Sequence, residues 1–244
     1  MTIGVIGAMD NEIRYIVDNL SHADKKSVYG YDFYTGMYKD FFGRYNDIVV
    51  VKCGVGKVNA ARCTQILIDR FFVNWIINTG VAGSISPEVS IGDVFIPKSI
   101  VQHDFDVTCL GYSKGYMCTG EDSNRPTYYK PYKTLRNDLL AYIEDLNIQK
   151  GENIVVKEGV LATGDIFIHD KEMKNKIRSK FGASAVEMES GAVGQTSFAA
   201  GIPFVVLRVI SDNADGSAPE DYQKFENEMA EKSAKIVMSF LYRE

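Results

Sequence analysis

Short runs rich in Val and Ile recur along the chain, and this feature constrains the fold most. The runs are apolar at most positions, which is typical of strands that are buried on both faces of a sheet. They lie at residues 2–7, 47–54, 75–80, 153–164 and 204–211. We therefore expect a central sheet that other layers cover on both sides.

Segments with helical spacing separate these runs. The first has apolar residues at positions 13, 16, 17 and 20, and the last has them from Tyr222 to Phe240. Strands that alternate with helices predict an α/β fold with a largely parallel central sheet. Because the chain has only six prolines and no charged or low-complexity tract, nothing in it resembles a linker, and we expect a single domain over residues 1–244.

Charge and cysteine content argue against several kinds of partner. The net charge is -5 and the Lys and Arg residues are scattered, so we expect no binding of nucleic acid or of an anionic membrane. The four cysteines form no CxxC pair, and the first residues, MTIGVIGAMDNE, do not resemble a leader peptide. These features predict a cytoplasmic protein with reduced cysteines and no membrane span.

Several of the predicted strands end in glycine or in a polar cluster. Glycine permits sharp turns and lets a ligand approach the backbone closely. In open parallel sheets, ligands bind at the carboxyl ends of the strands. We expect six such ends to line one rim, at residues 6–12, 53–61, 78–84, 162–167, 186–190 and 209–216.

Standard nucleotide and metal motifs do not explain these ends. Val51, just before CGVGKVNAA, stands where a P-loop needs its first glycine, and Asn59 breaks the GxGxxG pattern, so we expect a tight strand-to-helix turn. In QHDFDVT, the spacing of His103, Asp104 and Asp106 matches no standard metal site, and a hydrogen-bonded turn is the better interpretation. We expect no metal and no cofactor, and the sequence disfavours a Ser-His-Asp hydrolase.

The stretch AVEMES places two acids, Glu187 and Glu189, around Met188. Residues from Ser184 to Glu187 fit a capping box, which would explain Glu187 as an acid near a helix start. Residues two apart point in different directions on a helix, so this interpretation explains Glu189 less well. If the segment is a strand that leads into a helix, Glu189 lies at the strand end, where a ligand would bind.

Three further charged residues lie in or directly after apolar strands. Taken singly, Glu12 fits a first-turn acid and Asp212 fits a turn cap. Arg208 lies inside FVVLRVI, where a buried guanidinium needs anionic partners. We therefore expect Glu12, Glu189 and Asp212 to converge with Arg208 on one cleft.

Seven blocks of the sequence together resemble the bacterial 5'-methylthioadenosine/S-adenosylhomocysteine nucleosidases of the nucleoside phosphorylase superfamily. They follow the family's order nearly end to end: IGVIGAMDNEI, CGVGKVNAA, INTGVAGSI, HDFDVT with GY behind it, ATGDIFI, AVEMES and VISDNADG. The resemblance implies a three-layer αβα fold with a mixed, largely parallel sheet. It also implies hydrolysis of the bond between adenine N9 and ribose C1' in 5'-methylthioadenosine, S-adenosylhomocysteine and 5'-deoxyadenosine.

The resemblance implies a role for each acid. Glu12 resembles the general base that activates water, and Asp212 resembles the acid that protonates adenine N7. Glu189 resembles the carboxylate that holds the ribose hydroxyls, with Met188 packed on the sugar. A glycosidic bond that breaks through an oxocarbenium-like state needs a neutralised leaving group, an oriented water and negative charge near the sugar, which these acids can supply. Glu187 is then expected to support the strand-to-helix turn.

Further residues are expected to bind substrate by the same resemblance. Phe167 should cover the adenine ring, and the backbone of Ile168 should read its edge. Gly83 matches a glycine whose backbone approaches the ligand. The expected substrate-binding set is completed by Met9, Arg208 and Tyr222.

The resemblance also predicts a homodimer. The segment CLGYSKGYMC should reach the neighbouring subunit's pocket, with Leu110 and Cys118 on the 5' side. Its apolar and aromatic side chains are more typical of an interface than of a solvated turn. The chain departs from the family at two positions, since members commonly carry Ser where it has Val81 and an aromatic residue where it has Leu110. Val81 in place of Ser would remove a polar group near the expected water site. Leu110 in place of an aromatic residue could change the preference among 5' groups.

Three alternatives remain open. A phosphorylase-type transferase would use phosphate in place of water, but Glu12 and Val81 stand where phosphorylases of this superfamily carry arginine and serine, and a carboxylate repels phosphate. A futalosine-type nucleosidase would act on another 5' group, and sequence alone separates it poorly. A non-catalytic nucleoside-binding protein would keep the pocket but lose the acids, whereas all three acids are present.

Overall fold

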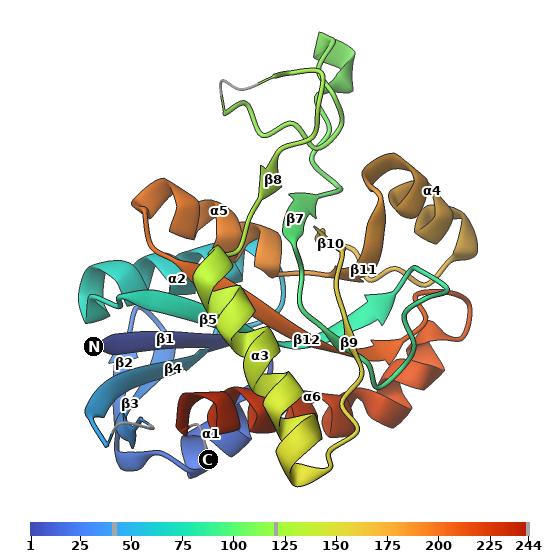
Figure 1. Cartoon of the computed structure of the whole chain (residues 1–244). Coiled ribbons are helices and arrows are strands. Elements are labelled where there is room, and N and C mark those ends of the chain that lie inside the picture. Colours follow the sequence, from blue (N-terminus) through green and yellow to red (C-terminus); the bar gives the residue numbers. More distant parts are fainter. Residues whose placement is uncertain (41–42, 120–121, 243–244) are drawn as a thin grey trace.

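The computed structural model describes residues 1–40, 43–119 and 122–242. Within them, the strands form one mixed sheet with helices on both faces (Figure 1). The strands are β1 (Thr2–Gly7), β2 (Ser21–Val28), β3 (Tyr31–Lys39), β4 (Tyr45–Lys52), β5 (Trp75–Ser84), β6 (Val94–Phe95), β7 (Ser99–Gln102), β8 (Tyr128–Tyr129), β9 (Val156–Lys157), β10 (Val160–Thr163), β11 (Ala183–Glu187) and β12 (Phe204–Asp212). The helices are α1 (Asp10–Asp18), α2 (Lys57–Phe71), the 3-10 turn η1 (Thr108–Leu110), α3 (Lys133–Lys150), α4 (Lys171–Phe181), α5 (Ser190–Ala200) and α6 (Ala218–Tyr242).

The central strand β5 organises the sheet. Strand β1 pairs in parallel with its first residues, and β12 pairs in parallel along most of its length. Strand β11 pairs antiparallel with its last residues, so that Gly83 has Val186 as one partner and Asp212 as another. Strands β7, β10 and β11 are parallel to one another, and β4 is parallel to β1. The sheet is therefore mixed with parallel strands at its centre, as predicted.

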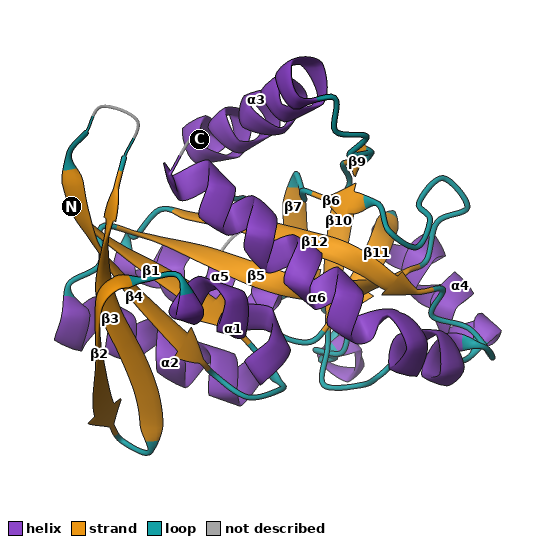
Figure 2. Cartoon of the chain, turned by 90° about the horizontal axis from the view of Figure 1, so that it is seen from below, coloured by secondary structure: helices purple, strands orange, loops and turns teal. Residues whose placement is uncertain are grey.

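Alternating side chains of the central strands build two core layers. In β1, Ile3 and Val5 pack in one cluster with residues of α1, α3 and α6. Ile6, on the opposite face of the same strand, packs in a second cluster with residues of α2 and α5. Figure 2 shows α6 lying along one face of the sheet and α2 and α5 on the other. The structure confirms the three-layer αβα arrangement, because a strand with apolar residues on both faces needs a helical layer on each.

Three elements differ from the expectations. The expected strand over residues 153–164 is split into β9 and β10. The first helix ends at Asp18, short of Leu20. The β2–β3 hairpin was not predicted, because β2 is a polar and almost entirely exposed edge strand that has no apolar run to reveal it.

A long connection between β7 and β8 extends away from the body of the molecule in Figure 1. We name its described residues, 103–119 and 122–127, the arm. Near its base, Asp106 accepts hydrogen bonds from the backbone N–H (3.0 Å) and hydroxyl (2.7 Å) of Thr108. The hydrogen-bonded turn expected in QHDFDVT is thus confirmed. None of the helices in the described part of the chain is both long and apolar enough to cross a membrane.

Candidate active site

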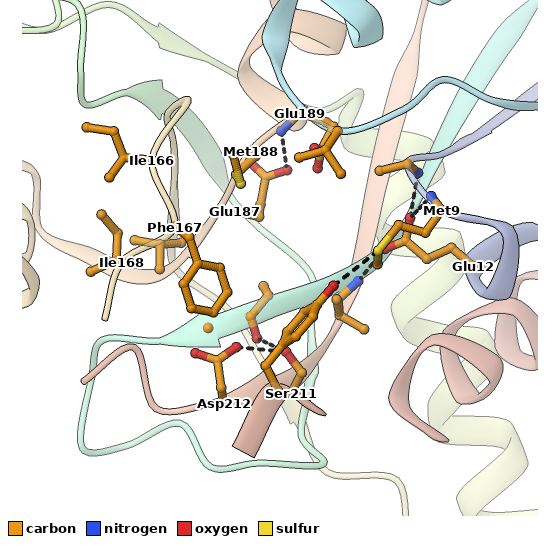
Figure 3. A pocket seen from close by; sticks show the side chains of 17 residues that line it. Met9, Glu12, Ile166, Phe167, Ile168, Glu187, Met188, Glu189, Ser211 and Asp212 are labelled. Atoms are coloured by element: carbon orange, nitrogen blue, oxygen red, sulfur yellow. Dashed lines mark hydrogen bonds between the residues drawn. The ribbon is translucent and has the colours of Figure 1, made fainter. Parts of the chain in front are cut away.

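A pocket opens at the carboxyl ends of β1, β5, β11 and β12 (Figure 3). It encloses about 550 Å³ of empty space, part of it open to solvent, which is in the usual range for a small-molecule site. All six segments that the sequence placed on one rim contribute to its wall. The lining residues are Ala8, Met9, Glu12, Val55, Val81, Ala82, Gly83, Ile166, Phe167, Ile168, Val186, Glu187, Met188, Glu189, Ser211, Asp212 and Tyr222.

Most of the predicted site residues share this wall, and three do not. Arg208 lies behind the wall, while Leu110 and Cys118 are exposed residues of the arm. The structure also adds residues that the sequence analysis did not single out. Ala8, Val55, Ala82, Ile166, Val186 and Ser211 line the pocket, and their nearness in sequence to predicted site residues was the only signal for them.

Glu12 projects from the first turn of α1 and is only 1% exposed. One carboxylate oxygen accepts the backbone N–H groups of Ala8 (2.5 Å) and Met9 (3.1 Å), and the other accepts that of Val81 (3.0 Å). Gly80, with φ of +148°, provides the space that the Glu12 carboxylate occupies, since a Cβ at residue 80 would lie 2.2 Å from Glu12 Oε1. Glu12 is thus both a first-turn acid and a lining residue of the pocket.

Burial raises the pKa of Glu12, although the charge of Arg208 and the three N–H donors act to lower it. Glu12 therefore holds a proton more readily than an exposed glutamate does. A raised pKa makes the carboxylate a stronger base, which suits general base work.

Arg208 is completely buried and holds a cluster of polar groups behind the pocket wall. Its Nη2 lies 2.6 Å from Glu187 Oε2, 2.8 Å from Asn78 Oδ1 and 2.9 Å from Ser190 Oγ. Glu189 Oε2 is farther away, at 3.7 Å. Arg208 has anionic partners, as predicted, but the acids expected beside it were Glu12, Glu189 and Asp212, and the nearest one is Glu187. Arg208 is not among the described residues that line the cavity, and it contacts two acids that do, so its predicted binding of substrate stays a prediction.

Glu187 ties the end of β11 to the start of α5. Its Oε2 accepts the backbone N–H groups of Glu189 (2.9 Å) and Ser190 (2.8 Å), and its Oε1 accepts the hydroxyl of Thr163. The expected support of a strand-to-helix turn is confirmed. The capping box at Ser184 is wrong, because residues 183–187 form β11 and the helix begins only at Ser190.

Glu189 is buried at the first position before α5, and its carboxylate faces the cavity. Its Oε1 accepts the backbone N–H of Gly56, 2.9 Å away in the turn between β4 and α2. Burial and the neighbouring charge of Glu187 raise the pKa of Glu189, while Arg208 opposes the rise. The carboxylate keeps acceptor positions free toward the pocket, which is what binding of a hydroxyl group requires.

Asp212 ends β12 and is 3% exposed. Its carboxylate accepts the backbone N–H of Ala214 and the hydroxyl of Ser211, each at 2.8 Å. Burial raises its pKa, the two hydrogen bonds lower it, and the acids Asp221 and Asp215 raise it further. A Cβ on Gly83 would lie 2.7 Å from Asp212 Oδ1, so only glycine fits beside this acid.

Aromatic side chains form another side of the pocket (Figure 3). The rings of Phe167 and Tyr222 meet edge to face, with centroids 5.5 Å apart. The hydroxyl of Tyr222 donates to Met9 Sδ at 3.1 Å, and Ile168 is buried next to Phe167. This apolar wall faces the acids, so the pocket suits a ligand with a flat apolar part and a polar part.

Known proteins resemble the chain over nearly its full length. A family model described as "Phosphorylase superfamily" matches residues 2–242. The 5'-methylthioadenosine/S-adenosylhomocysteine nucleosidase of Marinomonas sp. is 36% identical over 240 residues, which are 98% of this chain and 97% of that protein.

Two Helicobacter pylori structures share the fold closely. One is an Asp-to-Asn mutant of the nucleosidase with 5'-methylthioadenosine in the active site; it has a TM-score of 0.86 and 32% identity, over 98% of this chain and 97% of that one. The other is a futalosine hydrolase in its native form, with the same TM-score of 0.86 and 32% identity, again over 98% and 97%.

Proposed function

Because this chain belongs to the 5'-methylthioadenosine/S-adenosylhomocysteine nucleosidase family of the phosphorylase superfamily, and is therefore a nucleoside N-glycosidase, we propose that it hydrolyses 5'-methylthioadenosine and S-adenosylhomocysteine to adenine and the 5'-substituted ribose. 5'-Deoxyadenosine is a further proposed substrate. One observation carries the proposal: the buried carboxylates of Glu12, Glu189 and Asp212 face a single pocket.

Each carboxylate is proposed to have a different chemical role in the reaction. Asp212 gives a proton to adenine N7, so that the electrons of the C1'–N9 bond leave with a neutral base. Glu12 takes a proton from water as its oxygen bonds to C1'. Glu189 holds the ribose hydroxyls, and its charge stabilises the positive charge that develops on the sugar. Figure 3 shows the three acids approaching the cavity from different sides, which supports separate roles.

The other lining residues fit the parts of a nucleoside. Phe167 and Ile168 form the apolar wall on which the adenine ring is proposed to stack, and Gly83 brings the backbone close beside Asp212. Met188 lies between the two acids of β11 and would pack on the ribose. Met9 and Tyr222, which touch each other at the pocket wall, would contact the 5' side.

A homodimer is proposed as the working unit. Leu110 is 70% exposed in η1, and Tyr112 and Cys118 are also exposed in the arm. Several apolar and aromatic side chains on one arm are more typical of an interface than of a solvated turn. Leu110→Asp is expected to weaken association, measured by light scattering, and to weaken 5'-methylthioadenosine binding more than adenine release. A fully active monomer at assay concentration would contradict the dimer. Since all four cysteines are free, a reducing compartment, the cytoplasm, is also proposed.

A second candidate function is hydrolysis of futalosine. The likeness to the Helicobacter pylori futalosine hydrolase favours it, because this likeness is as high as that to the nucleosidase from the same organism. Both functions break an N-glycosidic bond and differ in the nucleoside that they accept. The geometry of the acids is compatible with either one.

A phosphorylase is less well supported than a hydrolase. None of the described residues that line the pocket is Lys or Arg, and Arg208 behind the wall is already paired with Glu187. A phosphate ion would meet acids and no free cation, which is unfavourable in a buried site. Water carries no such charge.

The decisive experiment measures release of the free base from each nucleoside in phosphate-free buffer. We expect adenine from 5'-methylthioadenosine, S-adenosylhomocysteine and 5'-deoxyadenosine, at rates that added phosphate leaves unchanged. Faster release from futalosine would instead support the second candidate. Formation of a ribose 1-phosphate on addition of phosphate would identify a phosphorylase. Tight binding without release of any base would identify a non-catalytic binding protein.

A further inference from the structure

Three segments that are far apart in sequence meet beside the pocket in one charged cluster. We name this cluster the loop clamp and define it as Lys57, Asp104 and Asp165. Lys57 Nζ lies 2.6 Å from Asp104 Oδ1 and 3.8 Å from Asp165 Oδ2. The backbone N–H of Lys57 donates to Asp165 Oδ1 at 2.8 Å, and the backbone N–H of Asp165 donates to Asp104 Oδ2 at 2.9 Å. Each member therefore touches the other two.

The loop clamp reaches the pocket through the turn that precedes α2. Gly56, next to Lys57, donates its backbone N–H to Glu189 Oε1 at 2.9 Å. The turn lies tightly against Asp165, since a Cβ on Gly56, which has φ of +99°, would be 3.1 Å from Asp165 Oδ1. The position of the N–H donor to Glu189 thus depends on the loop clamp.

A second connection runs through the segment after β10. The backbone N–H of His103 donates to the carbonyl of Thr163 at 2.9 Å, and that of Gly164 donates to the carbonyl of Glu187 at 3.1 Å. A Cβ on Gly164 would lie 2.3 Å from His103 Nε2, so the base of the arm and this segment are in close contact. The same segment continues into the pocket residues 166–168.

The loop clamp itself does not contact the cavity. None of its three members is among the described residues that line the pocket, and the side chains of Lys57 and Asp104 are 18% and 16% exposed. Burial acts to raise the pKa of Asp104, but hydrogen bonds from Lys57 and from the Asp165 N–H outweigh it and hold the pKa below its usual range. Asp104 is therefore ionised at neutral pH, and its attraction to Lys57 persists there.

We propose that Lys57, Asp104 and Asp165 are positioning residues for ribose recognition: the loop clamp holds the Gly56 N–H where it orients the Glu189 carboxylate toward the ribose hydroxyls. The inference rests on the proposed function, in which Glu189 binds the sugar. The acid and the base have other anchors. Glu12 is held by backbone groups of residues 8, 9 and 81, and Asp212 by Ser211 and Ala214. Loosening the clamp should therefore affect sugar binding more than the proton transfers at Asp212 and Glu12.

Two variants remove the central ion pair with little change in shape. Lys57→Met deletes the ammonium, and Asp104→Asn deletes the charge but keeps an acceptor for the Asp165 N–H. Each is expected to raise KM for 5'-methylthioadenosine by about tenfold, the lower end for a charge-assisted hydrogen bond, with a smaller fall in kcat. Discrimination against the 2'-deoxy analogue should fall by a similar factor. The double variant should be no worse than either single one, because both break the same pair.

Matched variants separate positioning from general loss of structure. Lys57→Arg keeps the charge and should restore most of the discrimination. Lys25→Met breaks an ion pair of 2.7 Å with Asp32 in the exposed β2–β3 hairpin and should change neither KM nor discrimination. The melting temperature of every variant is measured. If Lys57→Met is unfolded at the assay temperature, Asp165→Asn replaces it as the variant that weakens the loop clamp.

Two results would overturn the inference. One is unchanged discrimination between the ribose and 2'-deoxy ligands in Lys57→Met and Asp104→Asn. The other is a loss of kcat in proportion to melting temperature, with KM unchanged, which indicates a purely structural role. Ligand affinities are also measured by calorimetry, without turnover. A wild-type protein that releases no base from any nucleoside would overturn the proposed function instead, and the calorimetric comparison would still test the loop clamp.

Discussion

The groups that shift the pKa of the buried acids differ between the two ends of the pocket. At one end, Glu12 and Glu189 lie near Arg208, whose charge acts to lower the pKa of both. At the other end, hydrogen bonds from Ala214 and Ser211 lower the pKa of Asp212, and the nearby charges that affect it most are acidic. Burial raises the pKa at both ends, but among the described residues a cation is one of the largest opposing causes only at the first end.

The pKa of all three acids is raised, and the two ends differ in which groups oppose the effect of burial. Burial favours the protonated form of Asp212, and a protonated acid suits donation to a leaving base. The charge of Arg208 opposes this effect of burial at Glu12 and Glu189 without cancelling it, and favours the ionised form that binds water and hydroxyl groups. Five predictions test whether the proposed roles follow this division, in order of expected effect.

The largest effect is expected for Asp212→Asn. Without the proton donor, kcat should fall by about 10³-fold, or about 4 kcal/mol in barrier, while substrate affinity changes little because the amide keeps an acceptor for the Ala214 N–H. Single-turnover adenine release and calorimetric binding measure the two quantities. Asp215→Asn, in the same turn but outside the described lining, is the matched control and should stay active. A kcat within tenfold of wild type would exclude Asp212 as the acid.

Arg208→Met removes the cation that acts to lower the pKa of Glu12 and Glu189. It leaves Glu187 buried without its partner, so the free energy of unfolding should fall by about 3 kcal/mol or more, as measured by denaturant titration. Adding Glu187→Gln should recover part of the loss, because it removes the uncompensated charge. No recovery in the double variant would show that the two residues are not energetically coupled.

Glu12→Gln tests the base at the Arg208 end. Turnover should fall by about 100-fold, since the amide cannot take a proton from water, and binding should be retained. Stopped-time adenine assays and equilibrium binding to the same variant give both values. Adenine release at the wild-type rate would refute the assignment of Glu12 as the base.

Glu189→Gln probes sugar recognition at the same end. The variant should lose about 1.5–3 kcal/mol of affinity for the ribose, which is typical of a charge-assisted hydrogen bond to a hydroxyl, and should also react more slowly. Wild type should discriminate against a 2'-deoxy analogue, and the variant should not. Equal discrimination by both proteins would rule out a contact between Glu189 and the ribose hydroxyls.

The smallest expected effect is the pH-dependent contribution of Asp212 to the stability of the folded protein. Because its pKa is raised in the folded state, Asp212 favours folding at pH below the unfolded value of about 3.9, and this contribution is lost as pH rises through the folded pKa. At pH 8, Asp212→Asn should therefore melt roughly 2–4 °C higher than wild type. The gap should close as the pH falls toward 4. A gap that is independent of pH would mean that ionisation of Asp212 does not cause it.

Local pattern was enough to predict the layers of the fold and most of the pocket. The apolar runs that became β1, β4, β5 and β12 are buried on both faces, and such strands need helices on each side. Their ends lie at one edge because parallel strands share a direction, which is why six separated segments were predicted on one rim. The roles of Glu12, Glu189 and Asp212 stay predictions from chemistry and resemblance.

Other features depended on neighbours that are distant in sequence. Strand β11 runs against β5, and no local signal in ASAVE specifies that direction. The pairing of Arg208 with Glu187 and the loop clamp each join groups more than 20 residues apart. Sequence determined which side chains are apolar, charged or small, because periodicity and composition are local. Only the tertiary structure decided which charge meets which, because that depends on strand direction and burial, and these are set by packing of the whole chain.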